Sequence, residues 1–158
     1  MSDISLETVT GKLNRVGYDA FMRSLRHAKS AGNRNVELAH WLLHILSNDR
    51  SDISLTLDAY KIDRAKILKE LTDTTNGFRK NETEMPSVSS QITDLLDRGW
   101  QYATLFFGET QIRTGHILVA GLKSRELKRA LTQVSRALGE LEPDRIMAEA
   151  RKLWGQSD

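Results

Sequence analysis

A duplicated pattern of glycine, histidine and aliphatic residues constrains the fold of this 158-residue chain more than any other feature. The pattern covers positions 32–46 and again 108–122, and the same offset of 76 that separates His40 from His116 separates every other member from its counterpart. Such spacing is kept when each matched apolar residue faces the same interior in both copies. We therefore expect two copies of one helical unit around a shared core.

The offset between the two copies changes on either side of this pattern. Upstream the offset is 75 for three matched pairs: Phe21 with Leu96, Leu25 with Trp100, and Ala28 with Ala103. Downstream the offset is 79 for three further pairs: Ile62 with Leu141, Ile67 with Ile146, and Leu68 with Met147. The upstream change predicts one inserted residue in a turn of the second copy.

Apolar residues recur at spacings of three and four along the whole chain, as in amphipathic helices. The chain has only two prolines, and Pro143 suits the first turn of a final helix. These features predict an all-α fold with two pseudo-symmetric four-helix repeats plus an extra N-terminal helix. Within a single domain, 1–158, the expected parts are an N-terminal helix at 1–16, a first repeat at 17–73, a linker at 74–88 and a second repeat at 89–155.

Composition excludes several classes of function. The 23 basic and 21 acidic side chains nearly balance, so we do not expect the basic surface that nucleic-acid binding requires. The absence of cysteine excludes disulfides and thiolate sites. Asp3 and Lys12 interrupt any signal sequence, and the longest apolar stretch, Ile117–Leu122, is too short to cross a bilayer. We therefore expect a soluble protein that binds neither nucleic acid nor membranes.

The duplicated segments resemble a known family of helical domains. The two segments are GNRNVELAHWLL, from Gly32, and GETQIRTGHIL, from Gly108. They are similar to the repeated motif of the Clp N-terminal domain, found at the front of the protein-remodelling ATPases ClpA, ClpB, ClpC and ClpV. The sequences HWL at His40, IRTGH at Ile112 and GKLN at Gly11 most resemble ClpV of bacterial type VI secretion.

The resemblance implies a function in recognising substrates. It implies the recognition domain of a hexameric, cytoplasmic AAA+ ATPase that dismantles contracted secretion sheaths, by binding an N-terminal helix of the large sheath subunit. The isolated domain is then expected to be monomeric. An alternative is the corresponding domain of ClpA, ClpB or ClpC, which binds unfolded chains or adaptor proteins.

The sequence contains no nucleotide-binding motif. Gly11–Lys12 is the only Gly-Lys pair, and Leu6 stands where a phosphate-binding loop requires its first glycine. We therefore expect no cofactor and no enzymatic activity in this domain, with ATP and Mg²⁺ bound by the motor of the parent protein.

Histidines suggest a rival hypothesis from another class. His40 and His44 lie four positions apart, a spacing compatible with zinc and with a small metal-dependent hydrolase. No glutamate lies between them to act as a base, and no cysteine is available as a third ligand. The duplication already explains His40 and His116, so a structural role for both is favoured, and we expect no metal or catalytic residue.

An apolar trough lined at helical spacing is the expected site for a partner helix. The N-terminal helix offers Ile4, Leu6 and Val9, of which Leu6 has a competing role in the core. The predicted trough residues are Ser24, Val88 and Ile92 first, followed by Ala20, Leu95 and Leu6, and for Leu95, as for Leu6, a core position is the favoured alternative. Val88 precedes Ser89, a candidate N-cap, and so is expected to lie just outside a helix.

Overall fold

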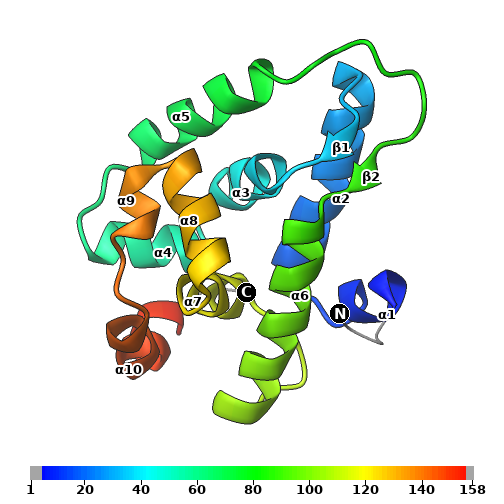
Figure 1. Ribbon diagram of the computed structural model, residues 1–158. Helices are drawn as coiled ribbons and strands as arrows, with labels where there is room; N and C mark the ends of the chain where they lie inside the picture. Colours follow the sequence, from blue (N-terminus) through cyan, green and yellow to red (C-terminus); the bar gives the residue numbers. More distant parts are fainter. Residues whose placement is uncertain (1–4, 156–158) are drawn as a thin grey trace.

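The protein folds into packed helices, as the computed structural model in Figure 1 shows for residues 5–155. In chain order the elements are α1 (Leu6–Thr10), α2 (Arg15–Ala31), β1 (Asn35–Val36), α3 (Leu38–Leu46), α4 (Asp52–Ala59), α5 (Arg64–Asn76), β2 (Ser87–Val88), α6 (Ser90–Gln101), the π-helix η1 (Tyr102–Phe106), α7 (Thr114–Leu122), α8 (Arg125–Val134), α9 (Arg136–Gly139) and α10 (Pro143–Trp154).

The all-α prediction is confirmed, and the duplication is visible in the order of the helices. Helices α2 to α5 form the first half, and α6, α7, α8 and α10 form the corresponding second half, with the short α9 inserted before α10. Buried aliphatic residues from both halves form one core, in which Trp41, Leu42, Ile117 and Leu118 are almost completely covered. No helix in residues 5–155 is long and apolar enough to cross a membrane.

Capping side chains determine where several of the helices begin. Six helices begin after a residue whose side-chain oxygen accepts a backbone N–H of the first turn: Ser5, Asn14, Ser51, Asp63, Ser89 and Ser124. Such caps satisfy donors that have no partner inside the helix. The predicted positions of Ser89 and Pro143 are both confirmed.

The predicted insertion takes the form of a π-helix. In each half a glycine with positive φ follows the first helix, Gly32 at 71° and Gly108 at 63°. One more residue lies between Ala103 and Gly108 than between Ala28 and Gly32, and the wider turns of η1 hold it. Beyond Ala103 the chain presents Leu105 and Phe106 to solvent, with 76% and 63% of their surface exposed.

Two details of the linker differ from the expectation. Helix α5 continues to Asn76, beyond the predicted end at 73, because Thr75 is buried against the core. The sequence analysis also did not predict two short parallel strands, in which Asn35 pairs with Ser87 and Val36 with Val88. These strands connect the end of α2 with the beginning of α6, which lie far apart in the sequence (Figure 1).

Replacing Gly115 with alanine tests the packing between α7 and α10. A Cβ at position 115 would overlap the ring of Trp154, so Gly115→Ala should lower the free energy of unfolding by about 1–3 kcal/mol in urea denaturation. Gly77→Ala is the matched control, because a Cβ there meets nothing nearer than 3.4 Å. Equal stability of the two variants would contradict this account.

Candidate functional site

The two repeated histidines have the same structural role. The Nδ1 atom of His40 accepts the backbone N–H of Glu37 at 2.9 Å, and that of His116 accepts the backbone N–H of Arg113 at 3.0 Å. Each histidine therefore caps its own helix from the third position. Because Nδ1 accepts, the ring is neutral and carries its proton on Nε2.

The second ring nitrogen also has a protein partner in both repeats. His40 Nε2 lies 2.9 Å from Asn33 Oδ1, and His116 Nε2 lies 3.1 Å from Glu109 Oε2. His44 Nε2 lies 3.0 Å from Nδ1 of His27. His40 thus has no free nitrogen for a metal, and residues 5–155 contain no group of three or more side chains arranged to hold one. The structural role of His40 and His116 is confirmed.

Burial keeps these imidazoles neutral. Desolvation, followed by the proximity of His27 and then His44, lowers the pKa of His40 to about 4. Desolvation and then His27 likewise lower the pKa of His44 to about 4. Burial also lowers the pKa of His116, although the nearby carboxylates of Glu109 and Asp52 oppose that change.

A buried ion pair joins the two halves. Arg113, just before α7, donates from Nε and Nη2 to the two carboxylate oxygens of Asp52, at 2.8 and 2.9 Å. Asp52 lies in the first turn of α4, is 2% exposed, and also accepts the backbone N–H of Gly115. Arg113 Nη2 also donates to the carbonyl of Trp154 at 3.0 Å. Its hydrogen bond with Asp52 raises the pKa of Arg113.

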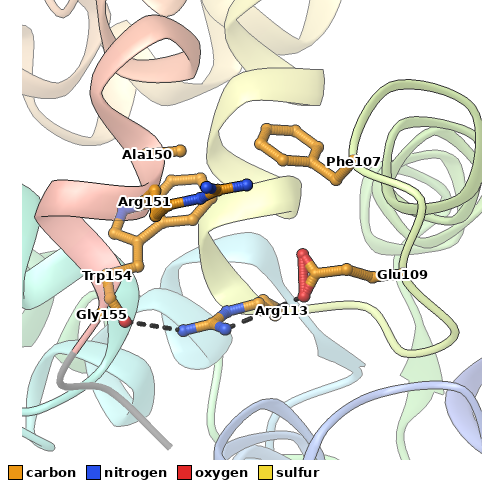
Figure 2. Close-up of a pocket in the computed structure, with 7 residues that line it drawn as sticks. All are labelled: Phe107, Glu109, Arg113, Ala150, Arg151, Trp154 and Gly155. Carbon is orange, nitrogen blue, oxygen red and sulfur yellow. Dashed lines mark hydrogen bonds and ion pairs between the residues drawn. The ribbon is translucent and has the colours of Figure 1, made fainter.

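A pocket of about 330 Å³ lies beside this pair, at the C-terminal end of α10. Figure 2 shows Arg113 between Glu109 and the end of α10, with the rings of Phe107 and Trp154 among the other lining side chains. Its polar groups are two arginines and one glutamate, and none of its lining side chains is a nucleophile. The sequence analysis missed this site. The sequence feature that could have indicated this site is Arg113, which stands in the second repeat where the first repeat has Glu37.

The structure places the predicted partner-binding residues of the first half on neighbouring elements. Leu6 lies on α1, is half-buried, and packs against the core. Ala20 and Ser24 lie on α2 and are 4% and 0% exposed. Ser24 donates its hydroxyl to the carbonyl of Ala20 at 2.7 Å, which satisfies the buried polar group. Val9 on α1 is also buried, and Ile4 lies outside the described residues.

The second set of predicted residues lies at the start of α6. Val88 is half-buried on β2, one residue before the N-cap of α6, as expected. Ile92 and Leu95 are 0% and 1% exposed on α6, and both belong to the core. Helix α1 packs against α6, and strand pairing connects α2 to β2, so the six residues lie on adjoining elements (Figure 1). Leu6 and Val88 keep part of their side chains accessible, and the role of all six in partner binding stays a prediction.

Comparison with known families identifies this arrangement. The model of the Clp repeat N-terminal domain matches residues 13–134, which include both histidine caps. The chain belongs to the Clp N-terminal domain family. Its repeats therefore correspond to the Clp repeats.

Two curated relatives contain this Clp N-terminal domain within longer proteins. The AAA+ ATPase ClpV1 of Pseudomonas aeruginosa is 35% identical over 157 residues, 99% of this chain and 17% of that protein. The chaperone protein ClpB of Yersinia enterocolitica is 28% identical over 132 residues, 84% of this chain and 15% of that protein. The chain thus spans less than a fifth of either relative, and its identity to ClpV1 is the higher of the two.

Solved structures agree with this relationship. One comes from work on the coevolution of the ATPase ClpV, the TssB–TssC sheath and the accessory HsiE protein. It is 34% identical to this chain, with a TM-score of 0.93, and the match covers 99% of this chain and 97% of that one. A complex of the ClpV N-domain with a VipB peptide has a TM-score of 0.82 at 18% identity and covers 99% and 96% of the two chains. At that identity the second structure supports the fold.

The histidine environments predict a loss of stability in acid. The unfolded chain binds protons at its imidazoles near pH 6.5, whereas folded His40 and His44 bind them only near pH 4. Their contribution to stability is therefore complete above pH 6.5 and is lost as the pH falls toward 4. Urea denaturation should show a decrease of about 3–4 kcal/mol between pH 7 and pH 5, roughly half from each histidine. His40→Gln should flatten this profile, and an unchanged slope would contradict the explanation.

Neutralising Asp52 tests the ion pair between the halves. Asp52→Asn removes the buried carboxylate that accepts from both Nε and Nη2 of Arg113 and should lower the free energy of unfolding by about 2–4 kcal/mol. Adding Arg113→Met should recover part of that loss. Asp144→Asn, which breaks the exposed pair with Lys123, is the control and should change stability by less than about 1 kcal/mol. Similar losses in the two single variants would contradict the assignment.

Proposed function

We propose that this domain is the substrate-recognition domain of a ClpV-type AAA+ ATPase and binds a helix near the N-terminus of the large subunit of the type VI secretion sheath. The observation that carries this proposal is the likeness to the ClpV-related structure, 34% identical over 99% of the chain with a TM-score of 0.93. A ClpV N-domain of the same fold is known in complex with a VipB peptide. A second solved structure of this fold is associated with a peptide from the SciI protein of a type VI secretion system.

The face made by α1, β2 and α6 offers a place for such a helix. Val88 lies at the N-terminal end of α6, and Leu6 lies on α1, which packs against α6. A partner helix along α6 would contact both half-buried side chains. Ser24, Ile92 and Leu95 are covered, so on this arrangement they support the face from beneath and contact a partner only when α1 or β2 shifts.

The parent protein supplies the remaining functions under this proposal. ATP and Mg²⁺ bind to motor domains outside this chain, which itself hydrolyses no nucleotide and needs no cofactor. A cytoplasmic hexamer presents six copies of the domain, and avidity then compensates for weak binding at each copy. The domain grips a contracted sheath subunit so that the motor disassembles the sheath and its subunits are recycled.

Replacing Val88 with arginine tests the proposed face. A charge forced into an apolar contact should weaken binding of the sheath-subunit helix at least about tenfold, as fluorescence anisotropy of a labelled peptide would show. Met85→Arg is the matched control, because Met85 lies in the loop just before β2 and is 62% exposed. It should bind the peptide as the unmodified domain does.

Two results would contradict the proposal. One is unchanged binding by Val88→Arg at an unchanged melting temperature. The other is a preference for a generic unfolded chain over the sheath helix, which would indicate the function of a ClpA-, ClpB- or ClpC-type domain.

A further inference from the structure

Helix α8 has a row of exposed cations that form no ion pair within the described residues. Arg125, Lys128 and Arg129 are exposed on the side of α8 opposite the core, at helical spacings of three and four. The ion pairs within residues 5–155 include none of the three, although Lys123 pairs with Asp144 and Arg136 with Glu140 on either side. These three cations are therefore free to pair with the carboxylates of another molecule.

An open hollow accompanies this row. It measures about 470 Å³ and is lined by Arg125, Lys128, Arg129, Thr132 and Gln133, with no carboxylate among them. Glu126 is the acidic residue of α8, and it is exposed but does not line the hollow.

A second, apolar hollow adjoins the first between the two halves. It measures about 300 Å³, and its wall includes Leu38 and Ala39 of α3, Phe78 after α5, and Ala130 and Val134 of α8. Gln133 lines both hollows, so the row of cations and the apolar hollow form one continuous surface. Glu37 is the carboxylate at its edge, and its Oε2 accepts the Asn35 side-chain amide at 3.4 Å.

The corresponding seam of the second half carries a larger side chain, Trp154. There Trp154 of α10 fills the space against Gly115, and its Nε1 donates to the Thr56 hydroxyl of α4 at 2.9 Å. At the downstream offset of 79, the counterpart of Trp154 is Thr75 of α5, which is far smaller. The hollow between α3, α5 and α8 therefore lacks the indole ring that lines the pocket of about 330 Å³ beside α10.

We propose that this surface, named here the α8 surface and comprising Arg125, Lys128, Arg129 and the apolar hollow beside them, docks an acidic amphipathic segment of a partner protein. Carboxylates of the segment pair with the three cations, and its apolar side chains enter the hollow beside Ala130. Charge complementarity selects an acidic partner, because the cations have no carboxylate of their own to displace. The wall of the apolar hollow also includes Gln91 in the first turn of α6, so the α8 surface adjoins the face of α1, β2 and α6 at that point.

A designed peptide pair tests this proposal. The probe is a helix of about 18 residues with a leucine stripe flanked by glutamates, and its control carries lysine at each glutamate position. With the ¹⁵N-labelled domain, the acidic peptide should shift the amide signals of α8, Leu38 and Phe78, and the basic peptide should not. Raising the salt from about 50 to about 500 mM should weaken binding, since exposed charges are screened.

A charge-reversal variant supplies the decisive comparison. The triple variant Arg125→Glu, Lys128→Glu and Arg129→Glu should weaken acidic-peptide binding at least about tenfold while keeping the helical circular dichroism spectrum. The matched control is Lys66→Glu, Arg98→Glu and Lys152→Glu, three exposed cations elsewhere on the domain with the same change in net charge. It should change the affinity less than about twofold if the site is local.

Three outcomes would overturn the proposal. The acidic peptide could leave the α8 signals unchanged, or the two triple variants could weaken binding equally. A single-stranded DNA oligonucleotide could also shift the same signals at lower concentration than the peptide does, which would assign the cations to phosphate binding.

Discussion

The buried pair of Asp52 and Arg113 is the contact on which the relation between the two halves depends. Asp52 belongs to the first half and Arg113 to the second, and the same guanidinium also holds the end of α10 through the carbonyl of Trp154. A carboxylate that is 2% exposed requires hydrogen-bond donors in place of water, and the donors to Asp52 include Arg113 and the N–H of Gly115. One ionic contact thus fixes where α4, α7 and α10 meet.

Much of the fold could be predicted because a duplication repeats its own constraints. The spacing from Gly32 to His40 indicated the start of α3, and its recurrence indicated the start of α7. The strands β1 and β2 could not be predicted, because each is only two residues long and too short to show periodicity. The role of Trp154 was also hidden, since its partner Gly115 lies far away in the sequence and only the folded chain brings them together.

The candidate site shows a different limit of sequence reasoning. Ile92 and Leu95 fit both a trough and a core, because helical periodicity identifies an apolar face without saying what covers it. The small, polar side chain of Ser24 predicts a position in the trough rather than in the core. Its hydroxyl instead donates to the backbone of its own helix, and this hydrogen bond allows the side chain to be buried. Val88 was placed correctly because its position followed from a capping residue, which marks a helix end whatever lies around it.

The π-helix η1 (Tyr102–Phe106) allows the surface of the second copy to differ from that of the first without altering the core. It absorbs an extra residue locally, so α6 before it and α7 after it keep the packing that the other copy has. Its rim carries Leu105 and Phe106, where the first copy, at the offset of 75, has Ser30 and Ala31. Twin units built on one plan can thereby acquire unlike outer faces while their shared centre stays intact.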